Sequence, residues 1–260
     1  MRTGNPTLSE HVFVNEAQNN SVASKTMTIQ GTVNKSAFLL MLLVTTAALT
    51  WQIAMSASDV VSPSGHVIPN VEVITPMLIG GAIIGLIAVL VSVFNKKMSA
   101  ITAPVYALAE GCFIGGISCI AESMFPGVVM QATALTFGVF FGLLSAYKSG
   151  LIKATENFKL GVAAATLGIF ALYMVSFVMS FFGTSVPYIH ESGLMGIGFS
   201  LFVVVIAALN LVLDFDFIEN GAEVGAPKYM EWYASLGLLT TLVWLYIEIL
   251  RLLIKLQSRD

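Results

Sequence analysis

Carboxylates at the end of one strongly apolar stretch are the first residues in this chain that could do chemistry. Residues 209–221 read LNLVLDFDFIENG and place Asp214, Asp216 and Glu219 within six positions. Residues two apart on a helix point about 200° away from each other, so the two aspartates cannot share a face. Asp214 follows the amide of Asn210 by one turn, and we expect these two residues to face the protein interior. Asp216 and Glu219 are expected to lead out of the membrane.

Other charged residues also lie within apolar stretches. Residues 244–256 read WLYIEILRLLIKL, in which Arg251 follows Glu248 by three residues and could pair with it across one helical turn. Arg251 and Lys255 are expected to extend toward the membrane interface. Glu110, in YALAEGCFIGG, has no basic residue within two turns along the chain. It is predicted either to form a structural hydrogen bond or to take part in ion movement, and the polar groups of Asn210 and Arg251 carry the same two interpretations.

A carboxylate pair between these stretches would respond to pH. If Asp214 meets Glu248 inside the protein, two buried like charges cannot both ionise cheaply, so the pair would share a proton near neutral pH. Acidification would then lock the two helices together, and higher pH would separate them. The freed oxygens of Asp214, Asp216 and Glu248 could bind a hard cation such as Ca²⁺ transiently. Whether Asp214 or Asp216 reaches Glu248 is left open by the sequence.

The composition is that of a polytopic membrane protein whose main partner is the lipid bilayer. Hydrophobic residues make up 57% of the 260 positions and charged residues only 10%, far from the balance of a soluble domain. The net charge of −3 makes nucleic acid an unexpected partner. Cys112 and Cys119 are two helical turns apart, too far for a disulfide within one helix. No cofactor is expected, and no metal cluster is expected from the three histidines, which fall outside the apolar segments.

Seven segments are long and apolar enough to cross a bilayer, which predicts an all-α, seven-helix transmembrane bundle. Glycines four apart, such as Gly81 and Gly85, favour close contact between these helices. We therefore divide the chain into a flexible cytoplasmic tail (1–35), a seven-helix domain (36–256) and a short C-terminal tail (257–260). The expected spans are 36–55, 76–95, 101–122, 128–147, 158–182, 193–214 and 233–256.

Basic residues predict a cytoplasmic N-terminus, because Lys and Arg accumulate in cytoplasmic loops. The first, third and fifth loops contain neither residue. Seven crossings would place the C-terminus outside, and a last segment that returns to the same side is the competing topology. The basic residues of the N-terminal tail and of the second and fourth loops are Arg2, Lys25, Lys35, Lys96, Lys97, Lys148, Lys153 and Lys159.

The two acidic stretches resemble motifs of the Bax inhibitor-1 family, seven-helix membrane proteins of bacteria and eukaryotic organelles, and most of all its longer bacterial branch. Asp214 matches an aspartate of the motif that ends the family's sixth helix, by its spacing to Ile218, and Asp216 takes the place of a glutamine. LYIE, which ends at Glu248, is similar to a Leu-Tyr-Leu-Asp motif in the last helix. AEGCFIG, which contains Glu110, resembles a Glu-Gly stretch of the third helix.

The resemblance implies a pH-sensitive Ca²⁺ leak in the inner membrane of a bacterium, governed by a carboxylate pair between the sixth and last helices. Two other functions stay open: an interaction protein that modulates membrane quality control, with a membrane protein such as a protease as partner, and a proton-coupled transporter. Enzyme activity is not expected. A serine protease, for example, would need a histidine within the spans, and none is present.

Overall fold

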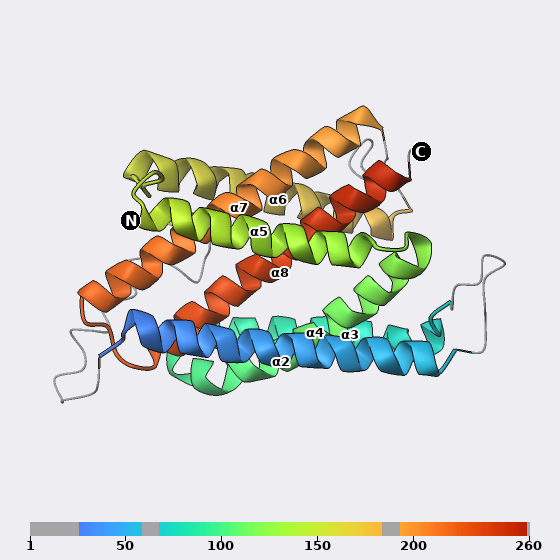
Figure 1. The fold of residues 1–260 in the computed structure, drawn as a ribbon, viewed down its shortest axis with the longest axis horizontal. Coiled ribbons are helices and arrows are strands. Elements are labelled where there is room, and N and C mark those ends of the chain that lie inside the picture. The colour runs from blue at the N-terminus through green and yellow to red at the C-terminus, as the bar shows by residue number, and fades with distance from the viewer. Residues whose placement is uncertain (1–25, 59–67, 184–192, 259–260) are drawn as a thin grey trace. The chain divides into compact units, whose positions relative to one another are not determined.

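The computed structural model describes residues 26–58, 68–183 and 193–258, and seven of its helices are long and apolar enough to cross a membrane (Figure 1). The predicted all-α class and the number of spans are thus confirmed. Within the described residues the only β-structure is a single bridge between Thr26 and Pro227. The helices are α2 (Ile29–Ser56), α3 (Val71–Phe94), the short 3₁₀ helix η1 (Lys96–Met98), α4 (Ser99–Met124), α5 (Val128–Lys148), α6 (Glu156–Phe181), α7 (Leu194–Glu223) and α8 (Met230–Gln257).

Local sequence signals set several helix ends. The side chains of Thr28, Asn70 and Thr155 accept hydrogen bonds from the free backbone N–H groups at the starts of α2, α3 and α6. After α7, Gly225 adopts a positive φ of 67°, a conformation that costs glycine little and ends the helix. These helices therefore begin and end at their capping residues and not at the limits of the apolar segments.

Two expected boundaries change for this reason. The sixth span was expected to end at Asp214, but α7 continues to Glu223, so neither Asp214 nor Asp216 ends the helix. The N-terminal tail was expected to run to residue 35, but α2 begins at Ile29 behind its Thr28 cap. Residues 1–25 of that tail lie outside the described residues.

The chain divides into two compact units, and α7 and α8 each contribute to both. Of the described residues, the first, called here the α2–α4 unit, comprises 26–58, 68–129 and 218–240. The second, called here the α5–α7 unit, comprises 130–183, 193–217 and 241–258. The second unit therefore holds Asp214, Asp216, Glu248 and Arg251, whereas Glu110 belongs to the first.

Helix α4 packs against both α2 and α3 in the α2–α4 unit, and glycines allow the close approach. A Cβ atom on Gly81 of α3 would lie 2.5 Å from the carbonyl oxygen of Ala109 in α4. A Cβ atom on Gly115 of α4 would lie 2.9 Å from the Cα of Ala47 in α2, and closer still to the carbonyl oxygen of Ala47. The small residues singled out in the sequence thus lie at helix–helix contacts.

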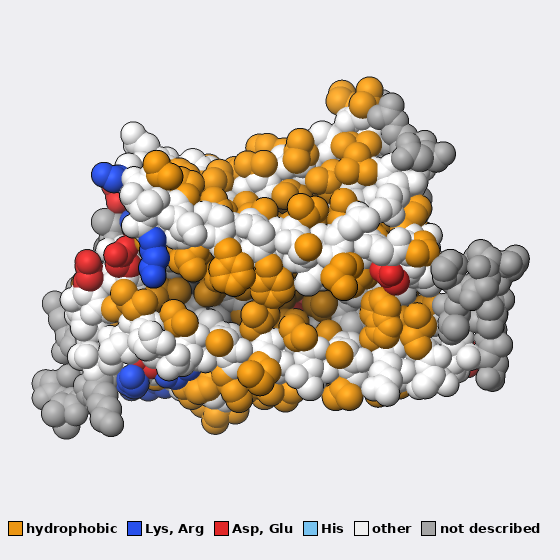
Figure 2. Space-filling view, in the orientation of Figure 1, with side chains coloured by type: hydrophobic (Ala, Val, Ile, Leu, Met, Phe, Trp, Pro, Cys, Tyr) orange, Lys and Arg blue, Asp and Glu red, His pale blue; other side chains and the backbone are white. Residues whose placement is uncertain are grey.

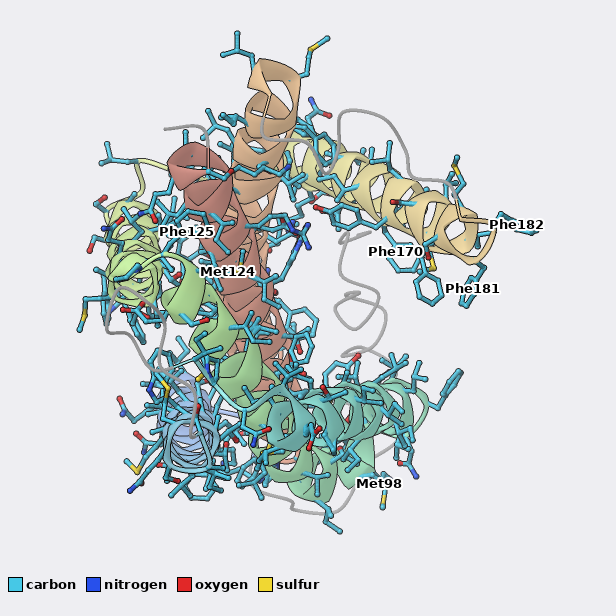
Figure 3. All side chains as sticks on the ribbon, turned by 90° about the vertical axis from the view of Figure 1, so that its right-hand side faces the viewer. Met98, Met124, Phe125, Phe170, Phe181 and Phe182 are labelled. Atoms are coloured by element: carbon cyan, nitrogen blue, oxygen red, sulfur yellow. The ribbon has the colours of Figure 1, made fainter. Side chains whose placement is uncertain are left out.

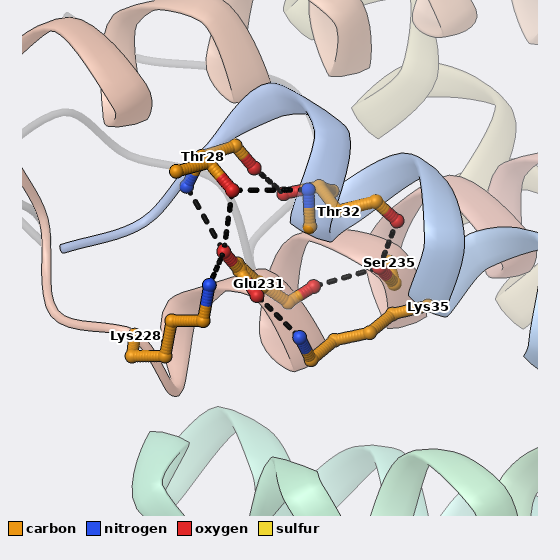
Figure 4. Close-up of polar contacts among 7 residues, drawn as sticks. Thr28, Thr32, Lys35, Lys228, Glu231 and Ser235 are labelled. Carbon is orange, nitrogen blue, oxygen red and sulfur yellow. Dashed lines mark hydrogen bonds and ion pairs between the residues drawn. The ribbon is translucent and has the colours of Figure 1, made fainter. Parts of the chain in front are cut away.

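A buried charge cluster joins the start of α8 to the start of α2 (Figure 4). The fully buried carboxylate of Glu231 accepts hydrogen bonds from the backbone N–H and the hydroxyl of Thr28, each at 3.0 Å. It also forms ion pairs with Lys35 and with Lys228, the latter at 2.7 Å. Ser235, one turn later, donates to the carbonyl oxygen of Thr32. The carboxylate lies at the N-terminus of α2, where the helix dipole favours a negative charge.

An aliphatic and aromatic core holds the α5–α7 unit together. Buried Ile169 of α6 clusters with Val203 and Ile206 of α7, and Trp244 of α8 packs against them. Phe215 of α7 makes an edge contact with Phe140 of α5, whose ring centroid is 5.7 Å away. Apolar contacts thus join α7 to α5, α6 and α8 in this unit.

Large apolar side chains cover much of the exposed helix surface, as expected for contact with lipid (Figure 2). Phe170, Phe181 and Phe182 extend outward from α6 and from the residue that follows it (Figure 3). All three are more than half exposed. In a soluble protein such a surface would drive association, whereas in a bilayer it faces hydrocarbon of the same polarity.

Substitution of Gly115 by alanine should destabilise the protein, because the added methyl group would collide with the backbone of Ala47. We expect a loss of about 1–3 kcal/mol, the usual cost of overpacking a well-packed contact. Thermal unfolding of the detergent-solubilised protein measures it. Gly168→Ala in α6 is the matched control, since nothing lies within 4 Å of its added Cβ. Equal stability of the two variants would contradict the close packing of α2 and α4.

Glu231→Ala should lower the free energy of unfolding by about 2–3 kcal/mol, because two lysines and the start of α2 lose a buried counter-charge. Glu231→Gln should cost less, since its amide oxygen still accepts from Thr28. The exposed carboxylate of Glu223 provides the control, and Glu223→Gln should change stability by less than about 0.5 kcal/mol. Denaturation monitored by tryptophan fluorescence distinguishes these outcomes.

Candidate functional site

Glu248 of α8 is the centre of a buried polar group in the α5–α7 unit. Only 1% of its surface is exposed. Its carboxylate accepts a hydrogen bond of 3.0 Å from the hydroxyl of Tyr173 in α6. The guanidinium of Arg251 donates to both carboxylate oxygens, at 3.1 and 3.3 Å, and to the Tyr173 hydroxyl at 2.8 Å. The three side chains therefore form a closed triangle of hydrogen bonds.

The pairing of Glu248 with Arg251 across one helical turn is confirmed. Because the pair lies on one helix, the buried carboxylate carries its own counter-charge wherever α8 moves. Arg251 also lies over the ring of Tyr173, with 5.3 Å between the guanidinium carbon and the ring centroid. Its side chain is 37% exposed, so the charge reaches the edge of the unit.

The two aspartates of α7 lie in different environments, as their helical phase predicted. Asp214 is 1% exposed. Asp216 is 18% exposed and forms an ion pair of 2.7 Å with Lys159 of α6. In the sequence Lys159 served only to indicate orientation, yet its side chain is buried. A lysine at the start of an apolar span can thus be a partner for a carboxylate on another helix.

Asn210 connects α7 to α6 one turn before Asp214. Its side-chain amide donates to the hydroxyl of Thr166 and to the carbonyl oxygen of Ile206, both at 2.8 Å. Asn210 therefore faces α6 at the level of Thr166, and Asp214, one turn later on α7, is also buried. An amide buried in this way is satisfied by its neighbours and supports close contact between the two helices.

Lys255, near the end of α8, is buried inside the protein, which the sequence did not predict. It is 5% exposed and donates to the carbonyl oxygen of Gly196 at 3.1 Å and to the hydroxyl of Ser200 at 2.9 Å. Both acceptors belong to the first two turns of α7. The antiparallel course of α7 and α8 supplies these acceptors, and no pattern within α8 alone could reveal them.

These contacts form a row through the α5–α7 unit, called here the polar ladder. On α6 its members Lys159, Thr166 and Tyr173 are seven residues apart, a spacing that keeps them on one helix face. Sequence reasoning missed all three as site residues, although this spacing was visible. In order along the unit, the contacts are Lys159–Asp216, Thr166–Asn210, Tyr173–Glu248–Arg251 and Ser200–Lys255.

Glu110 belongs to the α2–α4 unit and is not a member of the ladder. It is half-buried in α4, and its carboxylate oxygen lies 2.9 Å from the position that a Cβ atom on Gly85 would occupy. A glycine in α3 thus makes room for the carboxylate of α4. This arrangement fits the structural role predicted for Glu110 as well as a role in ion movement.

The carboxylates do not form a ready metal site. Among the residues that the structure describes, no three His, Cys, Asp or Glu side chains come together as a metal ion would require. Asp216 is held by Lys159 on a face of α7 other than that of Asp214. Transient Ca²⁺ binding by Asp214, Asp216 and Glu248 together would therefore require a different arrangement of these side chains.

Comparison with known proteins identifies the family. Residues 5–258, nearly the whole chain, match the family model described as Bax inhibitor 1 like. Searches of curated proteins and of solved structures give no match. The seven apolar helices and the acidic stretches of α7 and α8 agree with the resemblance seen in the sequence. The chain is a multi-pass integral membrane protein and belongs to the Bax inhibitor 1 like family.

Proposed function

We propose that this protein provides a slow, pH-sensitive leak for cations, including Ca²⁺, with Asp214 and Glu248 as the groups whose protonation closes it. The observation that carries the proposal is the burial of both carboxylates, one on α7 and one on α8, within one unit. Buried ionisable groups inside a membrane protein are costly and are commonly functional.

Protonation would act through a contact between Asp214 of α7 and Glu248 of α8, called here the latch. At acidic pH one proton shared by the two carboxylates would join the helices, and its loss would leave two negative charges that repel each other. Among the described residues, Tyr173 from α6 and Arg251 from its own helix bond to Glu248, and Lys255, two turns further along α8, interacts with it electrostatically. Arg251 balances one of the two charges, so separation would be driven mainly by the second carboxylate. Asp216 is the alternative partner, although its ion pair with Lys159 already engages it.

The proposal includes a location and an orientation. The protein lies in a bacterial inner membrane, with its N-terminus in the cytoplasm and its C-terminus on the other side. Lys96 and Lys97 in one loop and Lys148 and Lys153 in another support this orientation. The 28 residues of α8 form one unbroken helix. At a rise of about 1.5 Å per residue such a helix exceeds the roughly 30 Å of a bilayer core, which favours a full last crossing over a re-entrant segment.

Asp214→Asn should abolish the pH dependence of cation flux, because an amide neither titrates nor shares a proton. The wild-type protein in liposomes should admit Ca²⁺ faster as the pH rises from about 6 to about 8. The variant should show one rate across that range, measured with a trapped Ca²⁺ indicator.

Asp216→Asn is the matched control for this experiment. It removes the ion pair with Lys159 but should leave the pH dependence intact. Loss of the pH dependence in Asp216→Asn alone would assign the latch to Asp216. If both variants keep the pH dependence, the proposed latch is wrong. A complete absence of flux from the wild-type protein would favour the alternative function, an interaction protein that does not transport ions.

Reporter fusions test the orientation. Alkaline phosphatase, which is active only outside the cytoplasm, should be active when fused after residue 260 and inactive when fused after Ser149. Inactivity of the C-terminal fusion, with good expression, would support the competing topology in which the last segment returns to the cytoplasmic side.

A further inference from the structure

Glu110 of α4 is a partly buried titratable group that the latch does not use. It lies fourteen residues from either end of the candidate span Lys96–Met124, which places it near the middle of the membrane. Its carboxylate lies against Gly85 of α3, with one oxygen 2.9 Å from the position that a Cβ atom of that residue would occupy. One turn earlier on α3, Gly81 also allows the two helices to approach closely. The carboxyl group therefore lies in a helix–helix contact at mid-depth.

The helices packed around Glu110 supply no counter-charge for it. In the described part of α2, α3 and α4 the only cationic side chain is Lys35, near the start of α2, and it pairs with a carboxylate of α8. The one charged residue of α3 is Glu72, in its first turn. The titratable group that faces Glu110 is Tyr106, one turn earlier on α4, which interacts with it electrostatically. From α8, the neutral hydroxyl of Thr240 reaches Tyr106.

A carboxylate at this depth needs a bound proton or a bound cation to balance its charge. A metal ion would require several further oxygen ligands around it. Within the described residues no three His, Cys, Asp or Glu side chains come together, and Gly85 offers no ligand from a side chain. A proton requires no further ligand, and a neutral carboxylic acid can lie against a helix backbone in an apolar environment.

We propose that Glu110 is a proton-binding site in the membrane interior, separate from the latch, and that its proton allows α3 and α4 to lie in contact there. This inference does not depend on the proposed leak. Loss of the proton would leave a bare carboxylate against α3, where Gly85 has no side chain that could donate a hydrogen bond to it. The charge would then favour contact with water over contact with α3, so higher pH weakens this helix–helix contact.

Labelling with N,N′-dicyclohexylcarbodiimide tests the site, because this reagent dissolves in lipid and reacts with protonated carboxyl groups. The carboxyl proton moves to a nitrogen of the reagent, and the carboxyl oxygen bonds to its central carbon. Transfer of the acyl group from oxygen to nitrogen then gives a stable N-acylurea, which mass spectrometry of the digested protein locates. Part of the Glu110 side chain is exposed, so the reagent can reach it. In liposomes, the adduct on Glu110 should form at pH about 6 and be about tenfold less abundant at pH about 9.

Glu122 is the matched control, because it lies on the same helix and is also half-buried. Its two carboxylate oxygens accept hydrogen bonds from the backbone N–H groups of Gly127, at 2.6 Å, and Val129, at 3.1 Å. These bonds occupy the atoms that would react, so little adduct is expected on Glu122.

Thermal unfolding in detergent provides the second measurement. Glu110→Gln has the shape of the neutral acid, so it should unfold at the same temperature as the wild-type protein at pH about 6. At pH about 9 it should unfold about 2–4 °C higher, because the wild-type protein then carries an unbalanced charge. Glu122→Gln should lower the unfolding temperature at both pH values, since an amide replaces one acceptor oxygen by a donor.

The remaining outcomes overturn the inference. Equal labelling of Glu110 and Glu122 would attribute the reaction to exposure alone, and a Glu110 that stays unlabelled at both pH values would carry no proton. Labelling that does not fall at the higher pH would mean that the proton is never released. A Glu110→Gln variant that is less stable than the wild-type protein at both pH values would show that the ionised form is the native one. If that variant folds poorly, the labelling of the wild-type protein decides. The proposed leak is judged separately, by Ca²⁺ flux.

Discussion

Lipid offers no hydrogen bonds, and the structure of the α5–α7 unit depends on that constraint. Each polar side chain carried into the membrane must find its partners within the protein. The polar ladder is the result, because α6 supplies Lys159, Thr166 and Tyr173 at intervals that meet polar groups of α7 and α8. The apolar core around Ile169 packs these helices, and the ladder determines which faces meet.

Features that depend on local sequence were predictable. Seven apolar segments followed from composition, the burial of Asp214 from helical phase, and the Glu248–Arg251 pair from a spacing of three residues. Helix ends were less predictable from the sequence, because a helix does not end where its apolar stretch ends. Helix α7, for example, continues past the apolar stretch to Glu223.

Contacts between distant parts of the chain could not be predicted from these patterns. Thr166 and Asn210 are 44 residues apart, Ser200 and Lys255 are 55 apart, and Thr28 and Glu231 are 203 apart. Each depends on how helices face one another, which a single helix's periodicity does not encode. Only the seven-residue spacing on α6 hinted that one of its faces is polar.

Helix α8 is held by polar contacts at both ends, and this limits how the proposed latch can open. Glu231 fixes its first turn to α2, and Lys255 contacts the start of α7 near its end. If α8 separates from α6 near Glu248, the bond from Tyr173 breaks, but Arg251 stays with Glu248 because both lie on α8. Opening then costs Glu248 a hydrogen bond without separating its carboxylate from Arg251, which is far less costly than breaking a buried ion pair. A built-in counter-charge on the same helix thus makes a carboxylate suitable for a moving part.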